Sequence, residues 1–429
     1  MLPGSSLRGK GADVSAYQSQ YVIVGGSAAG MAAAHAIREK DARGTITVLS
    51  EESDDPYFRP LIPFLVSGQK QPAEMAMAGC GPYTGADITV QTGARVASVD
   101  SADRRVVLED GSQHGYAKIL FATGSRPYIP PEIEGTGAEG VFALRTLADA
   151  RRMAARIDRT EHAVMLGGGL LNLKAAFALL ERGVQVTLAV YSPEVLSQLM
   201  EPDDALLIRK ALDEAGLTVT TGVAATGVIA GATGVTGVAL DNGSELPCQM
   251  ICIGKGVRPN VEFLEGSGVQ VEGGIVADRY TGASLPGTFT AGDVAVTHEP
   301  VSGEPIMTAL WTNAVEMGRC AGMNMAGVKT AYTGTFGILN ATQVADEPFV
   351  AMGVVHTRKG DYEIHRIATA TTFRKLVFDA GGTRLVGAVF VGDITNTGLY
   401  RYVIREKMDV AGFKREIIDH TLHYGHFTH

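Results

Sequence analysis

The chain has 429 residues, of which 45% are hydrophobic and 53 are glycines, enough for a sizeable core with many tight turns and, at this length, about two to four globular domains. Its formal net charge of -9 disfavours nucleic acid or an anionic membrane surface as the main partner, because both attract a basic surface. No stretch is apolar for long enough to span a membrane or to form a secretory signal, so the cytoplasm is the expected location.

A first glycine-rich turn covers residues 25–30. The apolar periodicity on either side predicts a strand at 21–24, a helix at 29–39 and a second strand at 45–49. In such a strand-turn-helix unit the N-terminus of the helix faces a pyrophosphate, so the turn predicts a dinucleotide site.

Within this unit, Gly25 and Gly30 permit the tight turn and the close packing of helix on strand. Ser27 replaces the middle glycine and is small enough to keep the backbone near the phosphates. Glu51 and Glu52 follow the second strand, where a carboxylate can bind a ribose 2′-hydroxyl. We favour Glu51 for that contact.

A second glycine-rich turn covers residues 167–169. It follows a strand that starts near residue 164, and it precedes a predicted helix at 171–181 and a strand at 185–190. A chain with two dinucleotide sites usually moves electrons between them through a flavin, whereas one such turn is compatible with many chemistries.

The rest of the chain contains a further turn and a C-terminal segment rich in strand-like runs. A strand at 119–121 leads into a Gly- and Pro-containing turn at 122–127. Near the C-terminus, strand-like runs occur at 349–355, 371–378 and 385–391. The last two flank a predicted hairpin turn at 379–382, which indicates a third domain of α+β type.

The cysteine pattern predicts inert thiols. Cys80, Cys248, Cys252 and Cys320 form no C-x-x-C pair, so the sequence contains no relay disulfide or cluster motif of that kind. We expect Cys248 and Cys252 on one strand at 246–253, on the same face but too far apart to bridge.

Three ordered motifs resemble the flavin motifs of the FAD-dependent pyridine-nucleotide oxidoreductases. They are the turn at 25–30, Ala122-Thr123-Gly124, and the segment 290–295 that contains Gly292 and Asp293. The resemblance implies that Thr123 and Gly124 approach the FAD and that Asp293 holds its ribityl chain. An aspartate between a strand and a helix can accept hydrogen bonds from hydroxyl groups, although it can also be a helix N-cap.

The segment 56–63 is similar to the ferredoxin, rubredoxin and nitrite reductase branches of that family, which use no redox disulfide. Pro60 stands where the disulfide-reducing branches carry their reactive cysteine. The resemblance implies that Arg59 contacts the FAD phosphates or the flavin edge, with a surface arginine as the alternative. Trp311, the only tryptophan, lies in a segment similar to the one beside the flavin ring, with a core or interface aromatic as the alternative.

Together these patterns give the cofactor-binding candidates, with no residue assigned as catalytic and no metal expected. For FAD they are Gly25, Gly26, Ser27, Ala28, Ala29, Gly30, Glu51, Glu52, Arg59, Pro60, Val96, Ala122, Thr123, Gly124, Gly292, Asp293, Ala295 and Trp311. For the nicotinamide coenzyme they are Gly167, Gly169, Leu170, Leu171, Asn172, Lys174 and Gly256.

The second turn departs from the family pattern at two positions. Asn172 stands where the third glycine belongs, and Lys174 stands where relatives often carry a glutamate. The side chain of Asn172 is expected to push the helix outward or to narrow the pyrophosphate cleft, and Lys174 adds positive charge nearby. We expect a working site that prefers NAD over NADP. The alternative is that this unit keeps only the fold, with a site that is closed or that serves another ligand.

The strand at 186–191 ends without the acidic residue that binds an adenosine ribose, and no arginine follows at once for a 2′-phosphate. The segment 254–260, which contains Gly256, is similar to the family segment that closes this domain. This similarity favours a nicotinamide site that still works.

The C-terminal tail carries His420, His423, His426 and His429 at intervals of three. This spacing suggests a metal site, but Gly425 discourages the continuous helix that would bring the rings together. We therefore favour an interface or a solvated tail.

The fold class that follows is α/β, with two Rossmann-like dinucleotide-binding domains for FAD and NAD(P), the latter inserted, and a C-terminal α+β interface domain. We expect the FAD domain at 1–145 and 261–335, the NAD(P) domain at 146–260 and the interface domain at 336–429. The resemblance implies homo- or hetero-oligomers through the last domain.

The function that the resemblance implies is electron transfer between NAD(P)H and an iron-sulfur protein or subunit, in the reductase subunit of a larger redox enzyme. The chain is also similar, by size and branch, to the FAD subunit of tungsten-dependent aldehyde oxidoreductases. Two alternatives remain open: a direct NAD(P)H oxidase or small-molecule reductase, and a non-enzymatic scaffold subunit that holds FAD.

Overall fold

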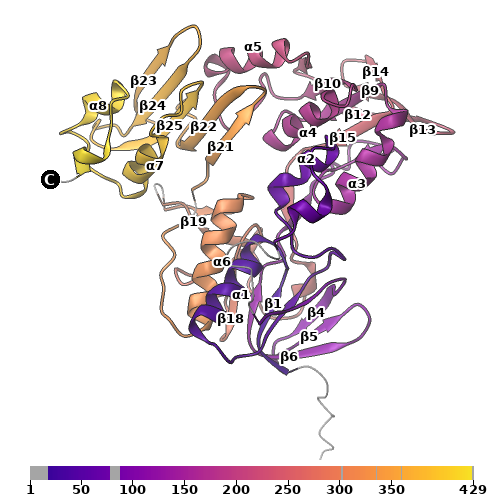
Figure 1. The fold of residues 1–429 in the computed structure, drawn as a ribbon, viewed down its shortest axis with the longest axis vertical. Helices are drawn as coiled ribbons and strands as arrows, with labels where there is room; N and C mark the ends of the chain where they lie inside the picture. The colour runs from indigo at the N-terminus through magenta and orange to yellow at the C-terminus, as the bar shows by residue number, and fades with distance from the viewer. Residues whose placement is uncertain (1–17, 78–86, 301–302, 335, 359, 428–429) are drawn as a thin grey trace, which may run out of the picture.

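The structure is a computed structural model that describes residues 18–77, 87–300, 303–334, 336–358 and 360–427. Figure 1 shows three lobes: one formed by the N-terminal part together with a later segment that returns to it, one by the middle of the chain, and one by the C-terminal part. Among the described residues, no helix is long and apolar enough to cross a membrane.

A seven-stranded sheet forms the core of the first lobe. Its strands are β1 (Gln18–Val24), β2 (Ile46–Leu49), β3 (Thr89–Gln91), β4 (Val96–Asp100), β5 (Arg105–Leu108), β6 (Gln113–Phe121) and β18 (Thr288–Thr290). The order is β3-β2-β1-β6-β5-β4, and β18 pairs with β6. Because β18 lies parallel to the end of β6, it brings a late segment of the chain back beside the first glycine turn.

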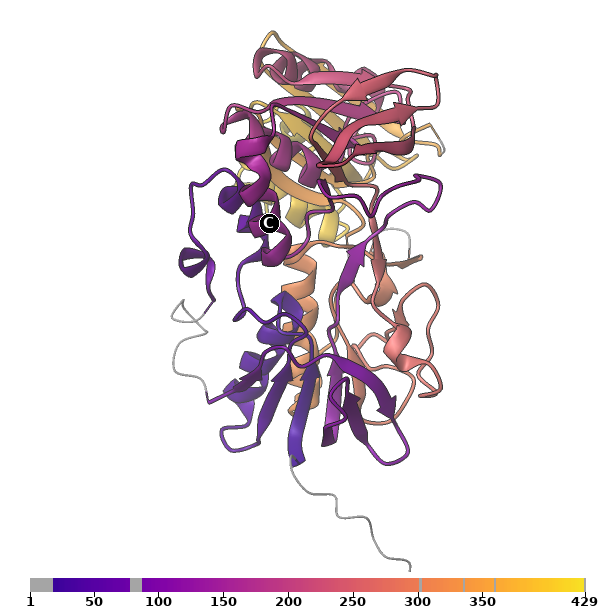
Figure 2. The same ribbon diagram turned by 90° about the vertical axis from the view of Figure 1, so that its right-hand side faces the viewer.

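Two helices, α1 (Ala28–Lys40) and α6 (Trp311–Met325), lie side by side on this sheet (Figures 1 and 2). Their approach depends on glycine: a Cβ on Gly318 would lie 2.1 Å from the carbonyl oxygen of Ala29. A Cβ on Gly322 would lie 2.4 Å from the carbonyl oxygen of Ala33. Small residues thus hold the middle of α6 close to the first turns of α1, next to the first glycine turn.

The second lobe contains a five-stranded parallel sheet with the order β11-β10-β9-β15-β8. Its strands are β8 (Val141–Phe142), β9 (His162–Leu166), β10 (Gln185–Val190), β11 (Thr218–Thr221) and β15 (Met250–Ile253). The accompanying helices are α3 (Leu147–Arg156), α4 (Leu170–Leu180) and α5 (Leu206–Glu214). A small antiparallel sheet follows, formed by β12 (Ala225–Gly231), β13 (Gly234–Leu240) and β14 (Glu245–Pro247). β15 is buried along its whole length, as expected for a central strand of a sheet covered on both faces.

The chain crosses between these two lobes along a pair of antiparallel strands, β7 (Ser125–Pro127) and β16 (Val257–Pro259). In addition, α2 (Ile62–Val66) packs its buried side chains into the core of the second lobe, although it belongs to the N-terminal part of the sequence. The two lobes are therefore joined by a strand pair and by shared apolar packing.

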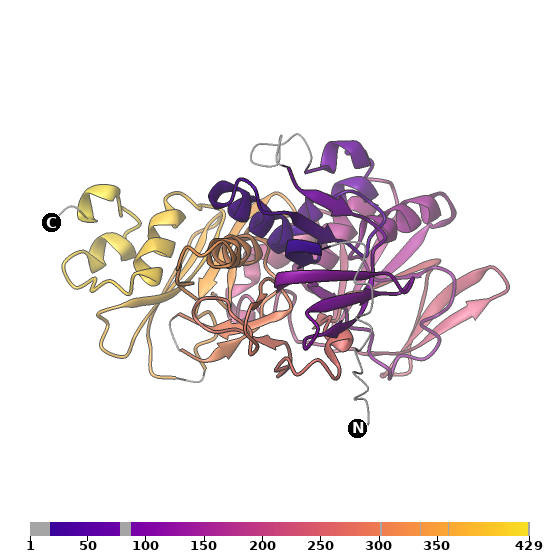
Figure 3. The ribbon, with the colours of Figure 1, turned by 90° about the horizontal axis from the view of Figure 1, so that it is seen from below.

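The third lobe is an antiparallel sheet with the order β21-β22-β25-β24-β23. It contains β21 (Leu339–Val344), β22 (Glu347–Gly353), β23 (Glu363–Ala368), β24 (Phe373–Phe378) and β25 (Leu385–Val391). Helices α7 (Thr397–Arg405) and α8 (Lys414–Ile418) cover one of its faces (Figure 3). The predicted hairpin at 379–382 is confirmed, since β24 and β25 pair directly on either side of it.

Short elements complete the fold. They are β17 (Ile275–Val276), β19 (Ala295–His298), β20 (Pro305–Ile306), and the 3-10 turns η1 (Arg59–Leu61), η2 (Pro72–Met75), η4 (Ile157–Arg159), η5 (Pro202–Asp204), η6 (Glu262–Leu264) and η7 (Tyr424–Phe427).

A buried ion network fastens the third lobe to the second. The Nζ atom of Lys375, whose side chain is fully buried, lies 2.7 Å from a carboxylate oxygen of Glu201 and 2.9 Å from one of Asp204. Arg366 donates to the same two carboxylates, at 2.8 Å each. Lys375, Glu201 and Asp204 are almost fully buried, so breaking this contact would leave buried charges unpaired, and the network disfavours separation of the two lobes.

The prediction of one strand at 246–253 is wrong. Cys248 lies between β14 and β15, because β14 ends at Pro247 and pairs with β13, while β15 joins the parallel sheet. A proline cannot donate to a further ladder bond, and the chain changes sheets there.

Candidate functional site

A cavity of about 980 Å³ runs along the first glycine turn and reaches the second lobe. Most predicted cofactor residues line it. They are Gly25, Gly26, Ser27, Ala28, Ala29, Glu51, Glu52, Arg59, Pro60, Val96, Ala122, Thr123, Gly124, Leu171, Gly292, Asp293 and Trp311. Residues from β1, β2, β4, α1 and α6, and from the turn that follows β6, thus meet in one elongated space.

The first glycine turn is shaped for close backbone approach. Gly25 has a φ of 116°, and a Cβ there would lie 2.1 Å from the carbonyl oxygen of Ala122. A Cβ on Gly30 would lie 1.8 Å from the carbonyl oxygen of Gly25, so Gly30 does not line the cavity but allows α1 to start where it does. Only glycine fits either position.

The N-terminus of α1 is open toward the cavity. Ser27 is its N-cap, and in the described structure the Ser27 side chain makes no capping hydrogen bond. By contrast, α3 is closed by a capping box of Thr146 and Asp149. The uncapped N–H groups and the dipole of α1 make this end an anion site suited to a pyrophosphate.

Two carboxylates follow β2, and they have different surroundings. Glu52 accepts a hydrogen bond from the Tyr57 hydroxyl at 2.7 Å and from Arg59 at 2.5 Å. Glu51 has a side chain that is 60% exposed and lies 3.4 Å from Arg95 at the cavity wall. Glu51 is therefore the carboxylate with free lone pairs for a ribose, whereas Glu52 organises Arg59.

The turn at 122–124 is hydrogen-bonded to the end of the inserted segment. The Thr123 hydroxyl donates to the carbonyl oxygen of Asn260 at 2.8 Å, and the Asn260 amide donates back to the carbonyl oxygen of Thr123 at 2.9 Å. The backbone N–H of Asn260 also donates to Gly124. These bonds hold the cavity wall at the crossing between the lobes.

Asp293 is one of the acidic residues that line the cavity, and Arg145 is its main partner. Arg145 donates to Oδ2 of Asp293 at 2.7 Å and to the carbonyl oxygen of Ser125 at 3.1 Å. Ser125 donates to the same Asp293 oxygen at 3.1 Å. The other oxygen of Asp293 is left to accept bonds from hydroxyl groups of a ligand.

Sequence reasoning missed Arg145, which lines the cavity. It stands directly before the Thr146 cap of α3, and nothing in the local pattern indicates that it reaches Asp293 in the other lobe. Its carbonyl oxygen accepts a bond from Arg59 at 2.7 Å, so the two arginines form one wall.

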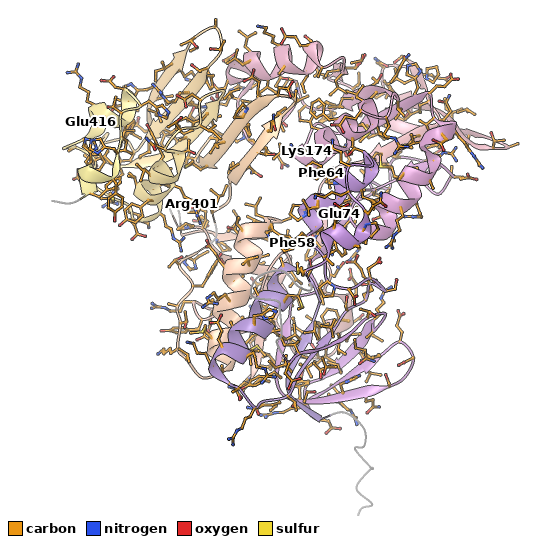
Figure 4. All side chains as sticks on the ribbon, in the orientation of Figure 1. Phe58, Phe64, Glu74, Lys174, Arg401 and Glu416 are labelled. Atoms are coloured by element: carbon orange, nitrogen blue, oxygen red, sulfur yellow. The ribbon has the colours of Figure 1, made fainter. Side chains whose placement is uncertain are left out.

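Part of the cavity wall is aromatic. Trp311 begins α6 and lines the cavity, and its ring centroid lies 6.0 Å from that of Phe58. Arg59 and Pro60, which follow Phe58 in the sequence, line the cavity. In Figure 4, Phe58 lies near the start of α6, at the level where the three lobes meet.

The second glycine turn repeats the geometry of the first. Gly167 has a φ of 115°, and a Cβ on it would lie 2.4 Å from the carbonyl oxygen of Gly254. Gly169 is the N-cap of α4 and has no side chain with which to cap it. This helix start therefore also offers free N–H groups to a phosphate.

Asn172 does not enter the cleft of the second turn. Its side chain is 3% exposed, and its amide donates to the carbonyl oxygens of Leu166 at 3.0 Å and Gly167 at 2.9 Å. A Cβ on Gly254 would lie only 2.3 Å from the Asn172 carboxamide, so the glycine directly after β15 makes room for it. The side chain is accommodated inside the fold.

Leu171 and Lys174 lie about one turn apart on α4. Leu171 is 45% exposed and lines the cavity of the first turn. Lys174 is half-buried, and burial lowers the pKa of its ammonium group. In Figure 4 it lies close to Phe64 of α2, on the side that faces the third lobe.

The remaining predicted residues do not line this cavity. They are Gly30, Ala295, Gly167, Gly169, Leu170, Asn172, Lys174 and Gly256. Gly256 has a φ of 99° and accepts a bond from Tyr128 where the strands cross, and Ala295 is buried at the start of β19.

The described cysteines are remote from this chemistry. Burial raises the pKa of the Cys248 and Cys320 thiols to about 11 and that of Cys252 to about 12. Such thiols are protonated and unreactive at neutral pH. Cys80 and His429 lie outside the described residues, and the described part contains no group of three or more potential metal ligands of the His, Cys, Asp and Glu types.

These features fit a bound FAD. The glycine cradle and the open α1 terminus suit its pyrophosphate, Glu51 suits its adenosine ribose, Asp293 suits its ribityl chain, and Trp311 lines the same cavity.

Comparison with known proteins gives the same assignment. Residues 19–318 match the family described as pyridine nucleotide-disulphide oxidoreductase. The chain is 29% identical to the NADH-dependent phenylglyoxylate dehydrogenase subunit epsilon of Aromatoleum evansii, over 95% of this chain and 96% of that protein. It is 30% identical to the ferredoxin--NAD(+) reductase component of the anthranilate 1,2-dioxygenase system of Burkholderia cepacia, over 73% and 77%. A solved NAD-dependent persulfide reductase from A. fulgidus superimposes with a TM-score of 0.85 at 25% identity, over 91% of this chain and 78% of that one. The matched residues include both glycine turns, and the chain belongs to the pyridine nucleotide-disulphide oxidoreductase family.

Proposed function

We propose that this chain is the reductase subunit of a multi-subunit redox enzyme, and that it passes electrons between NAD(H) and an iron-sulfur partner. The observation that carries the proposal is the position of Leu171. This residue belongs to α4, which starts at the second glycine turn, yet its side chain lines the cavity of the first turn. A coenzyme bound at the second turn would therefore have access to the cavity of the first turn, where the FAD would be held.

In this proposal the chain's residues bind and orient two cofactors. The open termini of α1 and α4 hold two pyrophosphates, Glu51 and Asp293 bind hydroxyl groups, and Leu171 and Trp311 shield the meeting point from water. FAD, when bound, accepts a hydride from the nicotinamide and returns electrons one at a time.

The one-electron carrier is proposed to be another polypeptide. The sequence has four cysteines and no C-x-x-C pair, so it provides no recognisable cluster ligands of its own. The relative from Aromatoleum evansii is named as a subunit of a dehydrogenase, and the one from Burkholderia cepacia as a ferredoxin reductase component. Both names support a partner of this kind, with electron flow in either direction.

The test is anaerobic mixing of the FAD-loaded protein with NADH and, separately, with NADPH. Loss of the visible absorbance of oxidised flavin would establish hydride transfer through the second site. Addition of a [4Fe–4S] ferredoxin or methyl viologen should then restore the absorbance quickly, and oxygen only slowly.

The alternatives give different results in the same experiment. A direct oxidase would be reoxidised by oxygen faster than by ferredoxin. A scaffold subunit would keep its flavin oxidised with both nucleotides, and that result would overturn the proposal.

We also propose that the chain acts in the cytoplasm. NADH is a cytoplasmic coenzyme, and the three described cysteines are free thiols, the usual state of cysteine in that compartment. Fractionation of cells that express the protein with a fluorescent tag would test this location.

A further inference from the structure

The end of β10 forms the rim of the second glycine turn. The N–H of Gly167 donates to the carbonyl oxygen of Ala189 at 3.0 Å, and the N–H of Leu196 donates back to the carbonyl oxygen of Gly168 at 2.8 Å. The segment 191–196 therefore bends over the turn, where the adenosine end of a dinucleotide bound there would lie.

The first dinucleotide unit contains a hydrogen bond equivalent to the one between Gly167 and Ala189, so residues of the two units can be matched. In the first unit, the N–H of Gly25 donates to the carbonyl oxygen of Leu49 at 2.8 Å. Gly25 thus corresponds to Gly167, and Leu49 to Ala189. Two residues further along, Glu51 in the first unit corresponds to Tyr191 in the second.

Tyr191 is an unusual residue for this position. A Rossmann unit commonly places a carboxylate here for the ribose 2′-hydroxyl, or an arginine for a 2′-phosphate. Tyr191 is instead an aromatic side chain that is 70% exposed. An exposed aromatic ring beside a ligand cleft offers a face on which a base can stack.

The nearby charges are already paired with each other. The Glu194 side chain is 1% exposed, accepts a bond from the N–H of Val195 at 2.9 Å and is held by Arg209. Ser192, next to Tyr191, bonds to the Ser197 hydroxyl at 3.0 Å. The rim therefore presents an aromatic ring and hydroxyl groups, with no free carboxylate from the segment 191–196.

We propose that Tyr191 binds the adenine of the nicotinamide coenzyme by stacking, and that this neutral rim discriminates only weakly between NADH and NADPH. This inference rests on the proposed function, because it assumes that the second turn holds a coenzyme. A carboxylate at this position would repel a 2′-phosphate, whereas a phenol ring contacts both coenzymes alike.

The test measures binding of ADP and of 2′-phospho-ADP to the FAD-loaded protein by calorimetry, so that FAD already fills the first site. The ratio of kcat/KM for NADH and NADPH in flavin reduction is measured in parallel. We expect the unaltered protein to bind the two fragments within about tenfold of each other.

Three variants of Tyr191 distinguish stacking of the ring on adenine from repulsion of the 2′-phosphate by a charge. Tyr191→Ala should weaken both fragments by about 5- to 150-fold, the range for loss of one base-aromatic stack. Tyr191→Phe should bind as the unaltered protein does, and Tyr191→Glu should weaken only the 2′-phosphorylated fragment, by at least about tenfold. Tyr424→Ala, which removes an equally exposed tyrosine on the third lobe, is the matched control.

Unchanged binding in Tyr191→Ala would overturn the inference, as would a rejection of 2′-phospho-ADP by more than about a hundredfold in the unaltered protein. If neither fragment binds and neither coenzyme reduces the flavin, the proposed function itself fails. If both coenzymes work but Tyr191→Ala has no effect, only the inference about Tyr191 fails.

Discussion

The carboxamide of Asn172 fills the space that a side chain on Gly254 would need. A Cβ on Gly254 would lie 2.3 Å from Oδ1 of Asn172, although the two residues belong to different elements of the second lobe. Asn172 stands at the third position of the fingerprint, where glycine is usual. Its larger side chain fits because the residue directly after β15 is a glycine.

We therefore predict that Gly254→Ala is destabilising by about 1–3 kcal/mol, the usual cost of overpacking a filled site. It should also raise the KM for NADH, because Gly167 packs against the carbonyl of Gly254. The measurements are urea unfolding and steady-state kinetics, with Gly412→Ala as the control, since a Cβ there meets no atom within 4 Å.

Adding Asn172→Gly to Gly254→Ala should recover part of the lost stability, because it removes the group with which the new methyl collides. A double-mutant cycle should give a coupling energy of about 0.5–3 kcal/mol. Strictly additive effects would show that the two side chains do not compete for this space.

Arg145 is predicted to be essential for tight FAD binding. It holds Asp293 in the cavity at 2.7 Å, and both side chains are less than one-fifth exposed. Arg145→Met removes a charged hydrogen-bond partner from that carboxylate, so the Kd for FAD should rise about 10- to 150-fold. Titration of the apoprotein with FAD measures this, with Arg152→Met on the exposed face of α3 as the control. An unchanged Kd for FAD would show that Arg145 does not contribute to FAD binding.

The contrast between these residues shows what the sequence can and cannot reveal. The two glycine turns are local patterns in which spacing alone dictates the backbone, so they indicate both dinucleotide units and the α/β fold. The partner of Asp293 and the space for Asn172 depend on contacts between distant segments, namely Arg145 before α3 and Gly254 after β15. The break at Cys248 is similar, because a change of sheet is a property of packing rather than of apolar periodicity.

Trp311 provides a direct report on FAD binding. It is the only tryptophan of the chain, and it lines the cavity. Because the flavin absorbs in the range where tryptophan emits, FAD bound in this cavity should quench most of the protein's tryptophan fluorescence. Titration of the apoprotein with FAD measures the quenching, with a fluorescence midpoint that matches the Kd from calorimetry. Stoichiometric FAD binding without quenching would place the flavin ring away from Trp311.

The ion network between the second and third lobes predicts a specific loss of stability in acid. Burial alone would raise the pKa of Glu201, but hydrogen bonds from Lys375 and Thr357 and the charge of Lys375 lower it to about 2. A carboxyl whose pKa is lower in the folded state stabilises the fold above its usual value of 4.5, and this contribution disappears as the pH falls from there toward 2. The loss should amount to about 3 kcal/mol.

Glu201→Gln should therefore be less stable than the unaltered protein at pH 7, and the difference should shrink steadily between pH 5 and pH 2, measured as about 3 kcal/mol at its largest by urea unfolding. Glu214→Gln is the matched control, because that carboxylate on α5 is 68% exposed and should change the acid profile little. A constant gap between Glu201→Gln and the unaltered protein across this range would mean that Glu201 titrates normally. The fixed position of the third lobe would then have to come from apolar packing around Phe349 and Val389 instead of from the buried charges.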